Sequence, residues 1–242
     1  MSITYVRYEL LRNTRNWRLS LFSAAFPLVL YCMVTGSQRG TDLQGVPFEV
    51  GFMSAMMTLN AMACAIANCV VIAAEHSNGW TRQLKIMPLG TATYLGTKAV
   101  NVYLRALLGI GVLALAGVAY GVRLSAGTWL TLIGLILIGV VPFVILGILL
   151  GDVLRADTAG VTTGGLVSLF ALLGGAYGFQ VATSGPLLVA VKALPSYWLV
   201  QAASSAIRLG SWPLQSWLVI ASWTAVLIPL TVVVHQRTTG RR

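Results

Sequence analysis

The strongest constraint in this sequence is a series of apolar runs, each long enough to cross a lipid bilayer as a helix. Crossing the hydrocarbon core requires about 17–25 mostly apolar residues. Six segments meet this requirement, at residues 19–36, 50–74, 99–122, 128–150, 159–181 and 214–234. Charged residues make up 9% of the chain, against about 25% in soluble domains. The sequence therefore predicts one all-α integral membrane domain over residues 1–242, with six transmembrane helices.

The placement of Lys and Arg predicts how these helices are oriented. Twelve cations fall on one side of the predicted membrane and four on the other. Because cytoplasmic loops carry the excess of Lys and Arg, both termini are expected in the cytoplasm. Topology also accounts for the net charge of +10, so no nucleic-acid partner is expected. The larger group comprises Arg7, Arg12, Arg15, Arg18, Arg82, Lys85, Lys98, Arg105, Arg155, Arg237, Arg241 and Arg242, and the smaller comprises Arg39, Arg123, Lys192 and Arg208.

Two further segments are predicted to lie at the membrane faces. In residues 1–18, Trp17 falls on the apolar side of a helical projection and Arg12 and Arg15 on the other, with Arg7 interrupting the pattern. This pattern favours an amphipathic helix in the inner headgroup layer; the alternative is an irregular basic leader. Residues 182–213 contain three prolines yet stay apolar, which favours short helices that re-enter the outer leaflet.

The segment at residues 75–98, between the second and third runs, is longer than a simple chain reversal needs. Trp80 and Leu84 are apolar, Arg82 and Lys85 are basic, and Pro88 would end a short helix. One interpretation is a docking helix for a cytoplasmic partner, with the tryptophan as anchor. The other is an interfacial turn whose tryptophan lies among lipid headgroups. The residues alone leave both open.

The run EHSNGWTRQLKIMPLGTATYLGTK resembles the coupling segment of ABC transporter permeases of the type-2 class, which export drugs and polysaccharides. In that family a Glu closes the second span, followed by Gly-Trp-Thr-Arg-Gln-Leu, Pro-Leu and Tyr-Leu before a Lys. The stretches YELLRNTRNWRLSLFSAAFPLVLY and ALPSYWLVQ agree as well, so the resemblance covers the whole chain. It is closest to small bacterial permeases without a fused ATPase. LGTATYL departs from the pattern, because prolines are expected before the tyrosine.

The resemblance implies the membrane-spanning subunit of an exporter in a bacterial plasma membrane. Two such subunits, identical or related, would form the pathway for an amphiphilic drug, antibiotic or lipid-like molecule. Two separate ATPase subunits would hold ATP and Mg, so this chain would need no cofactor, metal or catalytic residue. The amphipathic start would be the connecting helix that also touches the ATPase. The residues implied in ATPase coupling are Glu75, Gly79, Trp80, Thr81, Arg82, Gln83, Leu84, Lys85 and Pro88.

One face of the second span is a candidate substrate path. Two methionines, two asparagines and one cysteine recur there at spacings of four, three, four and four residues, which places them on one side of a helix. Amides facing lipid are costly, so this face should meet either protein or a water-filled cavity. A path for varied amphiphiles and ordinary interhelix hydrogen bonding both remain open. The residues are Met53, Met57, Asn60, Cys64 and Asn68.

Glycines in the fifth span form a candidate packing face. Gly160 and Gly164, and Gly174 and Gly178, are each spaced by four residues, and small residues let membrane helices approach closely. In the resembling family, spans one and five meet across the dimer. The alternative is close packing within one subunit.

The sequence gives little support for catalysis in this chain. GTATYLGTK has five residues between its glycines and fails the phosphate-loop pattern. Asp152 and Asp157 are expected in a short cytoplasmic turn with Arg155 between them, and His76 and His235 are far apart without ligand spacing. The rival interpretations are a lipid-modifying membrane enzyme, a secondary transporter, and a non-transporting sensor or immunity scaffold. Co-purification of an ATPase would separate the last from an exporter.

The predicted orientation is testable by labelling. Single cysteines at Ser2 and Thr239, in a background that lacks Cys32, Cys64 and Cys69, are expected to react with a membrane-impermeant thiol reagent only from the inner face. Labelling of either position from outside intact cells would contradict the six-span topology.

Overall fold

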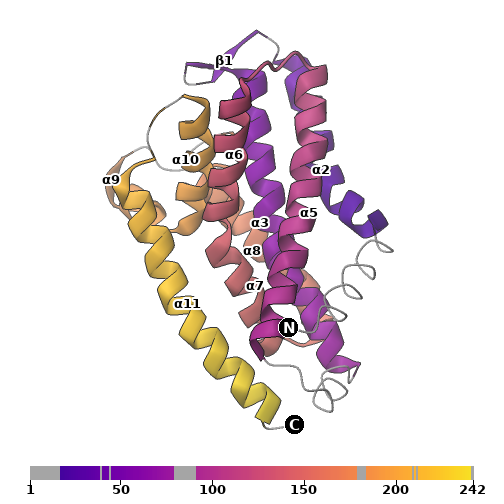
Figure 1. Ribbon diagram of the computed structural model, residues 1–242. Helices are drawn as coiled ribbons and strands as arrows, with labels where there is room; N and C mark the ends of the chain where they lie inside the picture. The colour runs from indigo at the N-terminus through magenta and orange to yellow at the C-terminus, as the bar shows by residue number, and fades with distance from the viewer. Residues whose placement is uncertain are drawn as a thin grey trace.

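The computed structural model describes residues 17–38, 40–43, 45–78, 91–178, 184–208, 210 and 212–240; the side chains of 17–23, 43, 91–92 and 238–240 are outside this description. Helices dominate the described chain, with one short hairpin between the first two (Figure 1). The elements are α2 (Trp17–Ser37), β1 (Asp42–Leu43), β2 (Val46–Pro47), α3 (Phe48–Ser77), α5 (Thr91–Ala119), α6 (Ala126–Gly139), α7 (Val141–Val153), α8 (Ala156–Gly174), α9 (Gly185–Lys192), α10 (Pro195–Ile207) and α11 (Leu214–Gly240).

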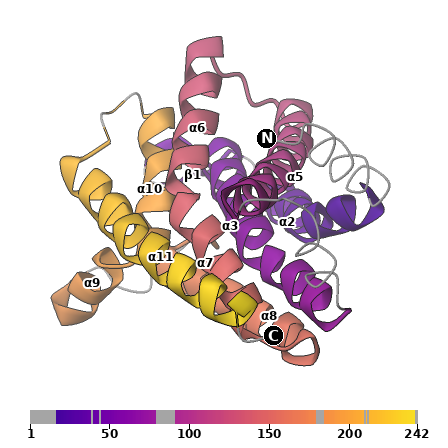
Figure 2. The ribbon, with the colours of Figure 1, turned by 60° about the horizontal axis from the view of Figure 1, so that its bottom comes forward.

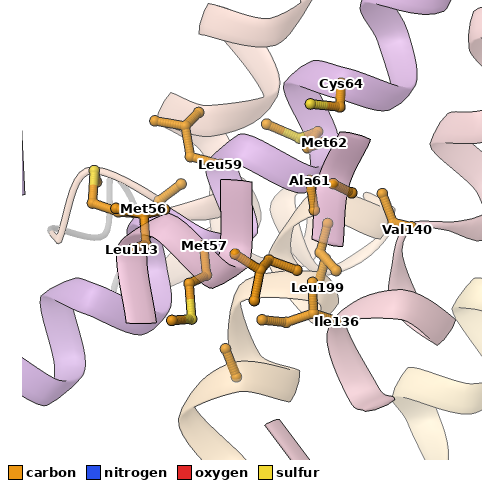
Figure 3. Packing of buried hydrophobic residues seen from close by; sticks show 14 of the residues in the cluster. Met56, Met57, Leu59, Ala61, Met62, Cys64, Leu113, Ile136, Val140 and Leu199 are labelled. Atoms are coloured by element: carbon orange, nitrogen blue, oxygen red, sulfur yellow. The ribbon is translucent and has the colours of Figure 1, made fainter. Parts of the chain in front are cut away.

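Helix α3 is the centre of the bundle. It packs against α7, α5, α8, α2 and α10, and its sequence is apolar around the whole circumference, as expected for a helix surrounded by others. Met56 and Met57 of α3 have no exposed surface and join a core with Leu113 of α5, Ile136 of α6 and Leu199 of α10 (Figure 3). Flexible thioether side chains fill the irregular spaces where helices of different direction meet.

Five of the described helical units are long and apolar enough to cross a membrane: α3, α5, the α6–α7 pair, α8 and α11. The bent pair of α9 and α10 would make a sixth. Helix α2 has 21 residues, of which the described apolar part, Ala24–Ser37, is shorter than a span. The prediction of an all-α, multi-pass membrane protein is therefore confirmed, whereas the six-span topology stays a prediction.

The fourth predicted span is interrupted. Helix α6 ends at Gly139 and α7 begins at Val141, with Pro142 in its first turn. Proline has no backbone N–H and its ring excludes the carbonyl four residues earlier, so one continuous helix is disfavoured here. The two halves still form one apolar unit, Ala126–Val153.

The fifth predicted span ends earlier than expected, at Gly174. The next residue, Gly175, caps α8 in the left-handed conformation, and Gly178 lies in the following turn with a φ of 88°. A Cβ on Gly174 would lie 2.9 Å from the Ser196 backbone, so Gly174 serves contact between α8 and α10 of the same chain. The expectation that Gly174 and Gly178 form one helical face is wrong, because the helix ends between them.

The predicted outer segment contains α9 and α10, which meet at an angle of 84°. Trp198 donates its indole N–H to the Lys192 carbonyl over 2.6 Å, and Trp223 of α11 donates to the Ala193 carbonyl over 2.9 Å. These bonds satisfy carbonyls at the end of α9 that no helical N–H reaches. The bond from Trp223 thereby attaches the bend between α9 and α10 to α11.

Close approach of α3 and α7 gives a first structural prediction. A Cβ on Gly147 would collide with the carbonyl oxygen of Ala65, which is backbone and has little freedom to move. Gly147→Ala is expected to destabilise the fold by about 1–3 kcal/mol, measured as a lower midpoint of thermal unfolding in detergent. Gly134→Ala on α6, where a Cβ meets nothing within 4 Å, is the matched control. Equal midpoints for both variants would contradict the close α3–α7 packing.

Candidate functional site

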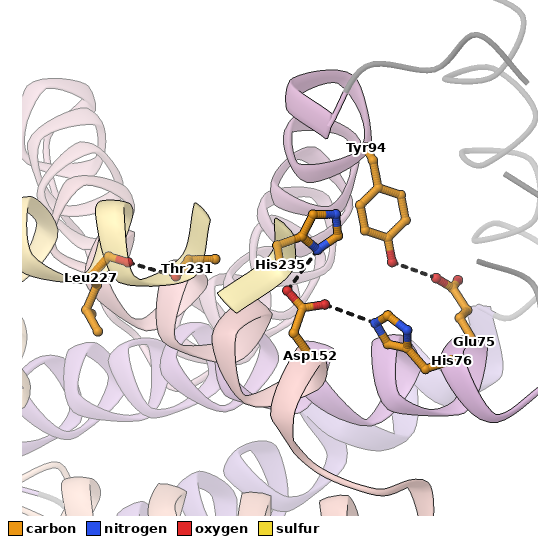
Figure 4. A network of polar contacts seen from close by, with 7 residues as sticks. All are labelled: Glu75, His76, Tyr94, Asp152, Leu227, Thr231 and His235. Atoms are coloured by element: carbon orange, nitrogen blue, oxygen red, sulfur yellow. Dashed lines mark hydrogen bonds and ion pairs between the residues drawn. The ribbon is translucent and has the colours of Figure 1, made fainter. Parts of the chain in front are cut away.

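Four helices bring polar side chains together at one end of the bundle. Helices α3, α7 and α11 end there and α5 begins there, and α7 lies between α3 and α11 (Figures 1 and 2). We name the cluster of Glu75, His76, Tyr94, Lys98, Asp152 and His235 the helix-end network; Figure 4 shows five of its six members. On the predicted topology this end faces the cytoplasm.

Glu75 is the acidic residue that α3 contributes to the network, and its partners lie on α5. Its carboxylate accepts from the Lys98 ammonium over 2.6 Å and from the Tyr94 hydroxyl over 3.1 Å. Glu75 is 6% exposed and Lys98 1%. Charges buried this deeply are tolerated only when paired and hydrogen-bonded. The contact therefore fixes the end of α3 to the start of α5.

The position of Lys98 differs from the sequence prediction. The third span was expected to begin at residue 99, with Lys98 in the preceding loop, but α5 begins at Thr91. Lys98 thus lies about two helical turns inside α5, facing α3. A span that is predicted from apolar composition ends at the first charged residue. In the structure the helix continues through Lys98, because the charge of this residue has a buried partner.

Asp152 is the acidic member contributed by α7. Its Oδ1 lies 2.9 Å from His76 Nε2 on α3, and its Oδ2 lies 2.9 Å from His235 Nδ1 on α11. Asp152 was expected in a short cytoplasmic turn with Arg155 and Asp157; this expectation is wrong, because α7 continues through Asp152 to Val153. His76 and His235, which are far apart in sequence, both reach Asp152 because the three helix ends converge. Arg155 and Asp157, 3.5 Å apart, do lie exposed beyond it.

Tyr94 joins the two acidic centres. Its ring stacks on His235 at a centroid distance of 5.7 Å, and the Lys98 ammonium lies 5.3 Å from the ring centroid. Contacts thus run from Glu75 through Tyr94 and His235 to Asp152 and back to His76, the neighbour of Glu75 in sequence. The network therefore closes a ring through four helices.

The hydrogen-bonding chemistry of Asp152 favours a structural role, in which its carboxylate connects α3 to α11. A carboxylate only accepts hydrogen bonds, and each neutral histidine tautomer offers one N–H. With the proton on Nε2 of His76 and on Nδ1 of His235, both oxygens of Asp152 are satisfied without any further group. The sequence offered one signal for this cluster: each of the three residues lies within a turn of the end of an apolar run at the same predicted membrane face.

The predicted coupling segment adjoins this network. Helix α3 ends at Ser77 with Asn78 as its C-cap, and α5 begins at Thr91, so the chain leaves and re-enters beside Glu75. The remaining candidate coupling residues, Gly79, Trp80, Thr81, Arg82, Gln83, Leu84, Lys85 and Pro88, lie outside the described residues, as do Arg7, Arg12 and Arg15. Trp17 is the first residue of α2, and its side chain is also outside the description.

The candidate substrate face of α3 is closely packed. Met53 and Asn60 occupy the spaces beside Gly117 and Gly109 of α5, and the Asn60 amide donates to the Ala106 carbonyl over 3.3 Å. Met57, Cys64 and Asn68 are buried as well. These contacts fit the packing alternative in this conformation of one subunit; a role in lining a path stays a prediction.

A small cavity lies at the opposite end of the bundle, between the start of α3, the turn after α8 and α10. Its volume is about 60 Å³, room for a few water molecules. From α3 it is lined by Gly51, Ser54 and Ala55, with Gln201 and Arg208 on the α10 side. None of the five candidate path residues lines it.

Comparison with known proteins indicates a transport role. The chain is 25% identical over 232 residues, 95% of its length and 94% of the relative's, to a protein of Bacillus subtilis (strain 168) named "Putative transport permease YvfS". No family model matches the chain, and no solved structure matches it. This chain is therefore a helical membrane protein similar to a transport permease, which favours transport over catalysis.

The buried ion pair gives a second structural prediction. Glu75→Gln and Lys98→Met should each destabilise the fold by about 3–5 kcal/mol, because each leaves a buried charge without its partner. The double variant should lose less than the sum of the single variants, as measured by thermal unfolding in detergent. Arg155→Gln, in the exposed pair with Asp157, is the control and should change the midpoint little. Strict additivity would show that Glu75 and Lys98 do not interact.

Proposed function

We propose that this chain is the membrane-spanning subunit of an ATP-binding-cassette exporter. Two copies, or one copy and a related permease, would form the pathway, and two separate ATPase subunits would drive outward movement of an amphiphilic molecule. The observation that carries the proposal is the buried Glu75–Lys98 pair, which brackets the segment resembling a coupling helix. Similarity to a transport permease over nearly the whole chain supports it.

The Glu75–Lys98 pair explains how docking of an ATPase at residues 79–90 would move the bundle. The segment is attached at Asn78 to α3 and at Thr91 to α5. Because Glu75 joins Lys98 and Tyr94, the end of α3 and the start of α5 are tied to each other. A force applied by an ATPase to the segment would therefore act on both helices together.

The proposed dimer face is the described start of α8. An added Cβ at Gly160 or Gly164 meets none of the described residues within 4 Å, so these glycines face outward from the part of the bundle that the structure describes. Small outward residues permit close approach of a second helix. This placement is compatible with contact between two permease subunits.

Trp80 supplies the test of ATPase docking. Trp80→Ala is expected to reduce co-purification of the ATPase at least tenfold, because aromatic anchors at interfaces often contribute about 2 kcal/mol or more. The measurement is pull-down of the tagged permease from membranes, with the bound ATPase quantified. Trp217→Ala is the control, since Trp217 is 42% exposed near the start of α11, at the end of the bundle opposite the network.

The outcomes separate the docking interpretation from its alternatives. Normal ATPase recovery with Trp80→Ala would show that this tryptophan does not anchor the partner. Absence of any ATPase from the wild-type pull-down would contradict the exporter proposal and favour a sensor, scaffold or lipid-modifying role.

A further inference from the structure

Helix α11 is the least embedded of the long helices. Only 17% of its most apolar stretch is buried, against 78% for α3, and it packs mainly on α7 with a smaller contact to α10. Pro229 lies inside α11, where it removes one backbone hydrogen bond of the helix. The part of α11 after Pro229 therefore depends on side-chain contacts to hold its position.

His235 supplies such a contact six residues after Pro229. It bonds one oxygen of Asp152, while His76 of α3 bonds the other, both over 2.9 Å. The side chains of His235, His76 and Asp152 are 8%, 9% and 0% exposed. A buried carboxylate with two donors from different helices is destabilised if either donor leaves, because one of its oxygens then lacks a hydrogen bond.

We infer that Asp152 is a positioning residue, which couples the end of α11 to α3 through His235 and His76. The inference rests on the proposed function: movement imposed on α3 by the ATPase would reach α11 through this carboxylate. Glu75, Tyr94 and Lys98 do the corresponding work between α3 and α5. Through the helix-end network, a movement of α3 would thus reach both α5 and α11.

The histidines are used here as hydrogen-bond donors. That role is separable from proton uptake, because an amide side chain places an N–H at a similar distance without titrating. The amide of His76→Gln replaces the Nε2–H donor, and that of His235→Asn replaces the Nδ1–H donor. Leucine at either position removes the donor. Thr231→Val is the matched control, since the Thr231 hydroxyl bonds Leu227 within α11 itself (Figure 4).

The first measurement uses the full chain alone in lipid nanodiscs. Amide hydrogen exchange is followed for the end of α11, residues 230–237. His235→Leu and Asp152→Leu are expected to speed exchange there about tenfold or more, because the anchor after Pro229 is lost. His235→Asn, His76→Leu and Thr231→Val should leave exchange within about twofold of wild type, since α11 stays attached to α7.

The second measurement adds the ATPase recovered with the wild-type chain and a non-hydrolysable ATP analogue. The analogue should change exchange at the end of α11 in wild type, His76→Gln, His235→Asn and Thr231→Val. His76→Leu should lose this response although its exchange without nucleotide is normal. A purely structural role of His76 would not produce that combination.

Three results would overturn the inference. They are normal basal exchange in His235→Leu, a normal nucleotide response in His76→Leu, and failure of His76→Gln to restore the response. The last would mean that hydrogen-bond donation at position 76 does not carry the response. Absence of ATPase binding to wild type would instead refute the proposed function, and the coupling role with it, while the first measurement would still test the Asp152 anchor.

Discussion

Burial of charge at one end of an apolar bundle is the constraint on which the rest of this structure depends. Glu75, Lys98 and Asp152 are each less than a tenth exposed, so each needs a partner at hydrogen-bonding distance. These residues and their hydrogen-bonding partners lie on four different helices, α3, α5, α7 and α11. The helix ends therefore have to converge, and the network fixes their relative positions. The apolar contacts in the rest of the bundle are not directional, so they do not fix these positions by themselves.

Close packing around α3 explains why the bundle is dense between its two ends. Glycines on α5 and α7 admit side chains or backbone of α3 that any Cβ would exclude, as at Gly109 beside Asn60 and Gly147 beside Ala65. The amides of α3 are consequently enclosed by protein. Within the part of the chain that the structure describes, the small cavity near the end opposite the network is lined by none of the candidate path residues.

The location of the network links the fold to the proposed transport role. It lies where the chain leaves α3 and enters α5, beside the segment that resembles a coupling helix. Similarity to a transport permease extends over nearly the whole chain.

The sequence by itself determined the membrane character, the approximate places of the apolar runs, and the segment between the second and third runs, because these depend on local composition. It could not show the break before Pro142 as a boundary between two helices, or that α8 ends at Gly174, since both depend on local backbone geometry. The pairing of Glu75 with Lys98, and of Asp152 with His76 and His235, was decided by tertiary structure alone. Residues up to 83 positions apart bond only after separate helices have packed, and no periodicity along the chain encodes which helix ends meet.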